Sequence, residues 1–218
     1  MTKKYRKRKR ENKLISFTSP LSPITERFRS IRTSIEYTLR DKDIRIIVLT
    51  SPNLCEGTST TIANLGVTYA YQGKRVLIVD ANLRKPSQHS IFRVSNMSGL
   101  STILVEKSAF LREVQEVPGI EGLSILSSGP IPIYPSELLS TNTMKNLVLD
   151  IQNYFDIILV DSPPVLVATD AQILTSLCDA TLLVVQSEKT EREELIESKK
   201  KLDFVKAPIL GVIVNQVN

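Results

Sequence analysis

The chain has 218 residues, of which 42% are hydrophobic and 23% charged, so it can bury a sizeable core as one globular domain. No apolar run reaches the roughly 18 residues of a membrane-spanning helix, and no apolar segment follows the basic N-terminus to make it a secretory signal. Two distant cysteines and one histidine disfavour a zinc site, and we expect a cytoplasmic protein.

The positive charge of the chain is concentrated at its N-terminus. Residues 1–13 hold eight Lys or Arg and one acid, whereas the rest of the chain holds 20 basic and 22 acidic side chains. Because like charges repel and this segment has little apolar surface to bury, we expect a disordered tail over residues 1–20, before a domain over residues 21–218. The tail is either a solubilising arm or an attachment to anionic lipid through residues 3–13, and we expect no specific nucleic acid partner.

Helical and extended patterns alternate after the tail. Apolar residues at helical spacing predict a helix over residues 24–39, and short β-branched runs bounded by turn residues predict strands. The strands are expected at 44–50, 75–80, 123–126, 155–161, 181–185 and 209–214. Further helices are expected at 59–71, 140–154, 168–177 and 190–204, with short helices in the looser stretch before residue 119. This alternation predicts a single α/β domain, with a P-loop NTPase-like parallel β-sheet sandwiched by helices.

Three predicted strand ends carry polar residues that suit a nucleotide. In an open parallel sheet, ligands bind outside the carboxyl ends of the strands. The first strand leads into a glycine-containing turn and a helix N-terminus, whose backbone N–H groups suit a phosphate. Asp80 and Asp161 end two further strands, where with the Ser59 hydroxyl they suit Mg²⁺, although each aspartate could also be only a turn former. The predicted nucleotide-binding residues are Cys55, Glu56, Gly57, Thr58, Ser59 and Thr60, and the predicted metal ligands are Ser59, Asp80 and Asp161.

Four segments together carry a family resemblance. Residues 51–61 (SPNLCEGTSTT) stand where a Walker A segment would be, residues 79–86 (VDANLRKP) are similar to a Walker A′ segment, and residues 160–164 (VDSPP) are similar to Walker B. Glu26, Arg29 and Arg32 form an E-x-x-R-x-x-R pattern on the first predicted helix. With these motifs, residues 22–215 resemble the bacterial tyrosine kinases of capsule and exopolysaccharide synthesis, in the form whose kinase is a chain separate from its transmembrane activator.

The resemblance implies roles for these residues. ATP and Mg²⁺ would be the cofactors, and Asp80 and Asp161 would be catalytic, by positioning the metal or by helping to deprotonate a tyrosine. Glu26, Arg29 and Arg32 would form the contact through which copies of the chain assemble as a ring. The partner would be a transmembrane polysaccharide co-polymerase that acts as activator, which implies a peripheral location at the inner face of the plasma membrane.

The sequence also departs from the family pattern. Thr58 replaces the phosphate-binding lysine, Asn82 replaces a second Walker A′ aspartate, and Cys55 replaces a loop glycine. No cluster of tyrosines follows the last predicted strand. Because phosphoryl transfer depends on positioning and electrostatic stabilisation, we expect losing the lysine to weaken it severely. Arg84 or Lys85 could compensate by reaching the phosphates, but we favour their remaining on their own loop.

Three functions remain open at this point. The favoured one is a tyrosine-kinase-like, ATP-binding protein that regulates capsular or exopolysaccharide synthesis and export with impaired catalysis. The second is an active protein tyrosine kinase, which would transfer phosphate from ATP to a protein tyrosine. The third is a partition-type P-loop ATPase, which leaves the arginine-bearing helix unexplained.

Overall fold

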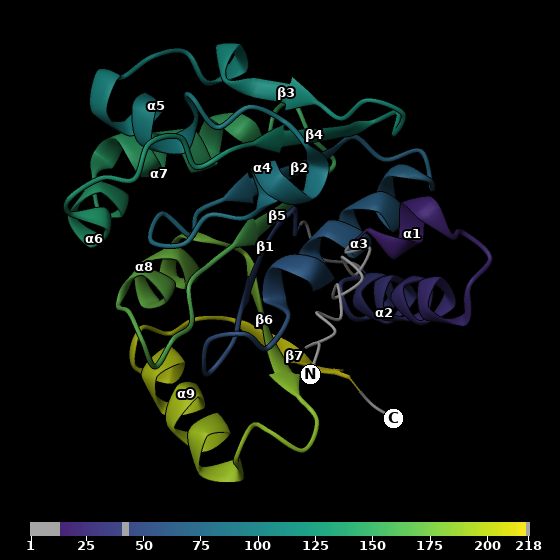
Figure 1. Cartoon of the computed structure of the whole chain (residues 1–218). Helices are drawn as coiled ribbons and strands as arrows, with labels where there is room; N and C mark the ends of the chain where they lie inside the picture. The colour runs from purple at the N-terminus through teal and green to yellow at the C-terminus, as the bar shows by residue number, and fades with distance from the viewer. Residues whose placement is uncertain (1–13, 41–43, 217–218) are drawn as a thin grey trace, which may run out of the picture.

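The computed structural model describes residues 14–40 and 44–216, and these form one α/β domain around a seven-stranded sheet (Figure 1). The strand order is β3-β4-β2-β5-β1-β6-β7, and the pairings are parallel except that of β3 with β4. The strands are β1 (Ile46–Thr50), β2 (Val76–Asp80), β3 (Val114–Glu116), β4 (Leu123–Leu126), β5 (Ile157–Asp161), β6 (Ala180–Gln186) and β7 (Ile209–Asn215).

Helices cover both faces of the sheet, as Figure 1 shows. One face is covered by α1 (Ile15–Thr18), α2 (Pro23–Thr38), α3 (Thr58–Ala70) and α4 (Gln88–Phe92). The other is covered by α5 (Leu100–Glu106), α6 (Pro135–Leu139), α7 (Asn142–Ile151), α8 (Asp170–Leu177) and α9 (Arg192–Phe204), while the short 3₁₀ helix η1 (Phe110–Arg112) leads into β3.

The central strands are buried on both faces because their side chains supply two separate cores. In β1, Ile47 and Leu49 pack into the core beneath α2 and α3, whereas Ile46 and Val48 pack into the core beneath α5 to α8. This alternation follows from the two-residue period of a strand. All five residues of β1 are buried, which explains why its sequence is continuously apolar up to Thr50.

The structure confirms the predicted α/β fold and its strands, and it differs from the prediction in several helices, in one short strand and in some element bounds. Helix α6 and strand β3 were not predicted, and α7 begins at Asn142, two residues later than expected. Residues 15–18, which composition assigned to the tail, form α1, and the Ser16 N–H donates to the Asn64 Oδ1 of α3 over 2.8 Å. The packed chain therefore starts before the expected boundary at residue 20, because Leu14 contacts the core. Residues 1–13 lie outside the described part.

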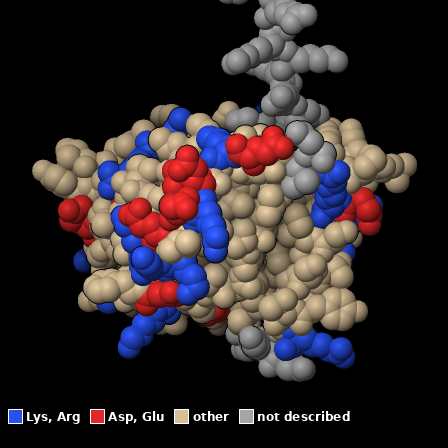
Figure 2. Space-filling view, turned by 90° about the horizontal axis from the view of Figure 1, so that it is seen from below, with Lys and Arg blue, Asp and Glu red and all other residues tan. Residues whose placement is uncertain are grey.

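The described surface carries charges of both signs. On the face seen in Figure 2, Lys and Arg side chains lie among Asp and Glu side chains and do not form a patch of one sign. Helix α9 contributes to this mixture, with ion pairs between Lys199 and Asp203 and between Lys201 and Glu197. No helix of the described chain is both long and apolar enough to cross a membrane.

Candidate functional site

The structure brings Asp80 and Asp161 together at the carboxyl ends of adjacent strands. They are direct partners in the parallel register of β2 and β5, and neither residue is accessible to solvent. Strand β1 lies on the other side of β5 and delivers the loop of residues 51–57 to the same edge. The alignment of strands therefore places two carboxylates beside this loop, as the rule for open parallel sheets predicts.

Burial makes the charged form of both carboxylates costly. Desolvation, followed by repulsion from Asp161, raises the pKa of Asp80 to about 7, although backbone N–H donors oppose the shift. Desolvation likewise raises the pKa of Asp161 to about 6, against hydrogen bonds from the side chains of Gln88 and Ser59. The pair is therefore poised to gain a cation or to hold a proton near neutral pH.

Gln88 organises the carboxylates but was missed in the sequence. Its backbone N–H and that of Ser87 donate to Asp80 Oδ2, each over 2.8 Å, at the start of α4. Its side-chain Nε2 donates to Asp161 Oδ2 over 2.6 Å and to the Ser59 carbonyl over 3.1 Å. This fully buried glutamine thus joins three parts of the site: both aspartates and the start of α3.

Oxygen atoms without partners remain at the same place. Within the described chain, Asp80 Oδ1, Asp161 Oδ1 and Gln88 Oε1 are buried and have no hydrogen-bond partner. Buried polar atoms are normally paired, so an unpaired carboxylate oxygen on each of two neighbouring strands indicates a cation partner. The residues present fit Mg²⁺, which prefers oxygen ligands, with Ser59, Asp80 and Asp161 as the predicted ligands.

The glycine-containing loop is shaped as a phosphate loop would be. Gly57 has φ +91° at the N-cap of α3, and a Cβ there would lie 2.1 Å from Asn215 Nδ2, so a side chain would be strained and would displace the Asn215 amide. Helix α3 begins at Thr58, and no side chain caps it. The backbone N–H groups of its first turn, which includes Ser59 and Thr60, therefore lack the side-chain acceptor that a cap would supply. Cys55 also has a positive φ, +64°, which costs a residue with a side chain about 1–2 kcal/mol.

Buried Glu56 holds this loop in place. Its Oε2 accepts from the Asn53 N–H over 3.1 Å, and its Oε1 accepts from the Thr190 hydroxyl over 2.6 Å. The side-chain amide of Asn215, at the end of β7, donates to the Glu56 carbonyl over 3.0 Å. The loop is therefore tied to the segment between β6 and α9 and to the end of β7, so Glu56 has a structural role beyond the predicted contact with a nucleotide.

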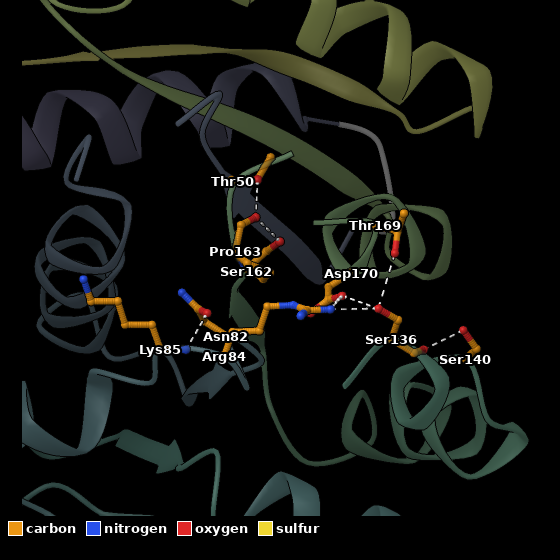
Figure 3. A network of polar contacts seen from close by, with 10 residues as sticks. All are labelled: Thr50, Asn82, Arg84, Lys85, Ser136, Ser140, Ser162, Pro163, Thr169 and Asp170. Atoms are coloured by element: carbon orange, nitrogen blue, oxygen red, sulfur yellow. Dashed lines mark hydrogen bonds and ion pairs between the residues drawn. The ribbon is translucent and has the colours of Figure 1, made fainter. Parts of the chain in front are cut away.

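Arg84 does not reach the loop, because a buried acid holds it elsewhere (Figure 3). Its Nε and one terminal nitrogen donate to the two carboxylate oxygens of Asp170, each over 2.9 Å, and Asp170 is fully buried. The same guanidinium donates to the Ser136 hydroxyl over 3.0 Å. Asn82 Oδ1 accepts from the Lys85 N–H over 3.1 Å, and the Lys85 side chain points away from Asp170. Arg84 therefore does not compensate for the missing lysine, but it also does not remain on its own loop as expected, because it pairs with Asp170 of α8.

The predicted oligomer contact lies on α2, and all three of its side chains have partners within the chain. Arg29 pairs with Glu26 over 3.0 Å, one turn apart on the helix. Arg32 donates to the Thr68 carbonyl of α3 over 2.6 Å. Arg32 therefore helps to pack α2 on α3, whereas Arg29 pairs within α2, and the role of both arginines between copies of the chain stays a prediction.

Comparisons with known proteins place the chain in a family. Residues 44–207 match the AAA domain family. The chain is 41% identical over 213 residues to the tyrosine-protein kinase YwqD of Bacillus subtilis, covering 98% of this chain and 90% of YwqD. It is 34% identical over 198 residues to the putative tyrosine-protein kinase CapB of Staphylococcus aureus, covering 91% and 86% of the two chains.

Solved structures agree with the sequence relatives. The chimerical protein CapA2B2 superposes with a TM-score of 0.89 at 38% identity, over 94% of this chain and 90% of that chain. The septum site-determining protein MinD of Pyrococcus horikoshii, at 22% identity and a TM-score of 0.67 over 78% and 69% of the chains, shares the fold alone. With its AAA domain and its similarity over nearly the whole length of two tyrosine kinases, the chain belongs to the family of bacterial tyrosine-protein kinases.

Proposed function

We propose that the chain is a Mg²⁺-ATP-binding, tyrosine-kinase-like protein that regulates capsular or exopolysaccharide synthesis and export and has impaired phosphoryl transfer. The observation that carries the proposal is an intact acidic pair, Asp80 and Asp161, facing a loop in which Thr58 replaces the phosphate-binding lysine. Support for nucleotide binding comes from the shape of the loop, and support for the tyrosine-kinase-like character comes from the similarity to the tyrosine-protein kinases YwqD and CapB. The regulatory role is what the resemblance of the sequence motifs implies.

The residues present can bind and orient a nucleotide better than they can transfer its phosphate. The N–H groups at the start of α3 would hold the phosphates, and Asp80 and Asp161 would hold a cation against them. Mg²⁺, when bound, would neutralise charge on the phosphate oxygens. A threonine hydroxyl at position 58 donates one hydrogen bond but supplies no charge, so the stabilisation of the transferring group is reduced.

The acid pair would also set the protonation state of the site. When its pKa is near 7, Asp80 can accept a proton from a tyrosine hydroxyl held beside it, since a general base works best with a pKa close to the working pH. A bound cation would favour the charged form of the pair and remove this capacity in part. The two tasks predicted for Asp80 therefore compete, which is a second reason to expect slow transfer.

A phosphorylation assay distinguishes a chain with impaired phosphoryl transfer from an active tyrosine kinase. The native chain, Asn82→Asp, and Thr58→Lys combined with Asn82→Asp are incubated with Mg²⁺ and labelled ATP, with a synthetic glutamate–tyrosine copolymer as acceptor. We expect transfer to rise on the order of 100-fold in the double variant, as restoring a preorganised charge does in other sites. Equal, robust transfer by all three proteins would instead support the active kinase. The 41% identity to YwqD keeps that alternative in view.

We further propose that the chain works at the inner face of the plasma membrane beside a transmembrane co-polymerase, with residues 3–13 attracted to anionic lipid. Each basic residue near such a surface contributes about 1 kcal/mol. Sedimentation with vesicles of phosphatidylcholine and phosphatidylserine should pull down the full chain at low salt and release it at high salt. Equal binding by a variant with these basic residues changed to serine would contradict the proposal.

A further inference from the structure

The loop lacks its own lysine, and the surrounding acids make that loss more costly. Glu56, Asp80 and Asp161 are all buried near the place where the phosphates of a nucleotide are proposed to lie. Nucleotide phosphates add several negative charges, which one divalent cation does not fully balance. Arg84 is committed to Asp170. A basic side chain other than Arg84 would therefore strengthen the binding of phosphate at this loop.

We infer that Lys189, on the loop between β6 and α9, is a phosphate-binding residue that supplies the positive charge missing at Thr58. Its ammonium donates to the backbone carbonyls of Leu54 over 3.1 Å and of Cys55 over 3.3 Å. Both acceptors belong to the loop that would surround the phosphates. The inference rests on the proposed binding of a nucleotide at this loop, and names one residue that this binding uses.

The ammonium of Lys189 has capacity for a further contact. Its two acceptors are neutral carbonyl oxygens, and none of the ion pairs found in the described chain involves it. An ammonium has three N–H donors, so one remains for an anion. The side chain is exposed, and it can shift toward a phosphate without leaving a buried space.

The backbone that carries Lys189 is held to the loop by its neighbours. The Thr190 hydroxyl donates to Glu56 Oε1, and it also accepts from the Gln186 N–H over 3.0 Å. The first turn of α9 is closed by a capping box between Glu191 and Glu194. These contacts do not depend on the ammonium of Lys189. Replacing this lysine should therefore remove a charge while the two loops stay joined.

A purely structural role would give a different result from a phosphate contact. If Lys189 only latched the loop through the two carbonyls, its loss would weaken all ligands of the site alike. A contact with phosphate requires the loss to grow with the number of phosphates. The measurement is therefore the affinity of the full chain for adenosine, ADP and ATP with Mg²⁺, by isothermal titration calorimetry.

For Lys189→Met we expect ATP affinity to fall about tenfold, the size of a hydrogen bond to a charged group, with a smaller fall for ADP and none for adenosine. Lys189→Arg should retain most of the ATP affinity. Lys200→Met, an exposed position on α9, is the matched control and should change nothing. In a Thr58→Lys background the effect of Lys189→Met should shrink, because the two lysines would then serve one function.

Two results would overturn the inference and leave the proposed function standing. They are an unchanged ATP affinity in Lys189→Met, and an equal fall in affinity for all three ligands. A phosphate-dependent fall in Lys85→Met, with none in Lys189→Met, would assign the charge to Lys85 and also overturn it. If the native chain binds none of the three ligands, the proposed function fails, and the inference fails with it.

Discussion

The site has an acidic half (Asp80, Asp161 and Gln88) and a loop half (residues 51–58), and the fold fixes the residues of the acidic half more firmly. Asp80, Asp161 and Gln88 are fully buried, and the carboxylates are fixed by strand register and by hydrogen bonds at the start of α4. The loop half contains an exposed Cys55 with a positive φ and an uncharged Thr58. The buried residues at the strand ends therefore tolerate little substitution. The loop tolerates other residues as long as Gly57 and buried Glu56 maintain its shape.

The largest effect is expected from the acidic half. Asp161→Asn removes one of two carboxylates that face the predicted cation, and the Mg²⁺ dependence of ATP affinity should fall by at least about tenfold, since even outer partners of a metal contribute that much. Titrations of the variant with ATP, in Mg²⁺ and in a chelator, measure this dependence. Asp150→Asn, at an exposed position of α7, is the control. An undiminished Mg²⁺ dependence in Asp161→Asn would show that this half does not hold the metal.

The next effect concerns pH and uses the chain without metal or nucleotide. Because burial raises the pKa of Asp80 to about 7 and of Asp161 to about 6, the folded state holds protons that the unfolded state has already lost. This contribution to stability is complete below about pH 4, the ordinary value for an aspartate, and is lost as the pH rises through 7. Thermal unfolding should therefore shift to lower temperature by several degrees over this range.

Asp80→Asn tests that assignment. The variant has one carboxylate fewer and relieves the repulsion on Asp161, so the decline of the unfolding temperature between pH 4 and 7 should become shallower. Differential scanning calorimetry of both proteins in the same buffers provides the comparison. An identical decline in the two proteins would mean that groups other than this pair cause it.

The smallest effect is expected from the loop half. Cys55→Gly relieves a positive φ, and we expect it to stabilise the fold by about 1 kcal/mol, which raises the unfolding temperature by roughly 2–4 °C in a chain of this size. Lys206→Gly, at φ +56° and away from the loop, is a matched control that should stabilise similarly without changing nucleotide affinity. A loss of stability in Cys55→Gly would mean that the cysteine side chain makes a favourable contact that outweighs the strain.

The sequence predicted the two aspartates of the site better than the residues that hold the site by hydrogen bonds. Asp80 and Asp161 stand at the ends of clearly apolar strands, so their convergence could be expected from the strand pattern alone. Gln88 could not be found in this way, because it lies in a five-residue helix within a stretch that shows no periodic pattern. Asn215 ends β7 and could have been found by the rule that identified the aspartates.

The contacts between distant segments were beyond sequence reasoning. Lys189 donates to backbone carbonyls 134 and 135 positions earlier in the chain, and no local sequence pattern predicts such a contact. Helix α1 was missed because its four residues follow a highly charged run, and the composition of that run dominated the interpretation. Strand β3 has three residues and runs antiparallel at the sheet edge, where a short strand gives little alternation to detect.

Helix α1 has a mechanical consequence. The side chain of Asn64 accepts from the backbone of Ser16 and donates to the carbonyl of Thr60, so α1 is hydrogen-bonded to the first turns of the helix that starts at the loop. A force applied to the chain at the start of α1 would therefore be transmitted through these hydrogen bonds to α3, and so to the loop that ends where α3 begins.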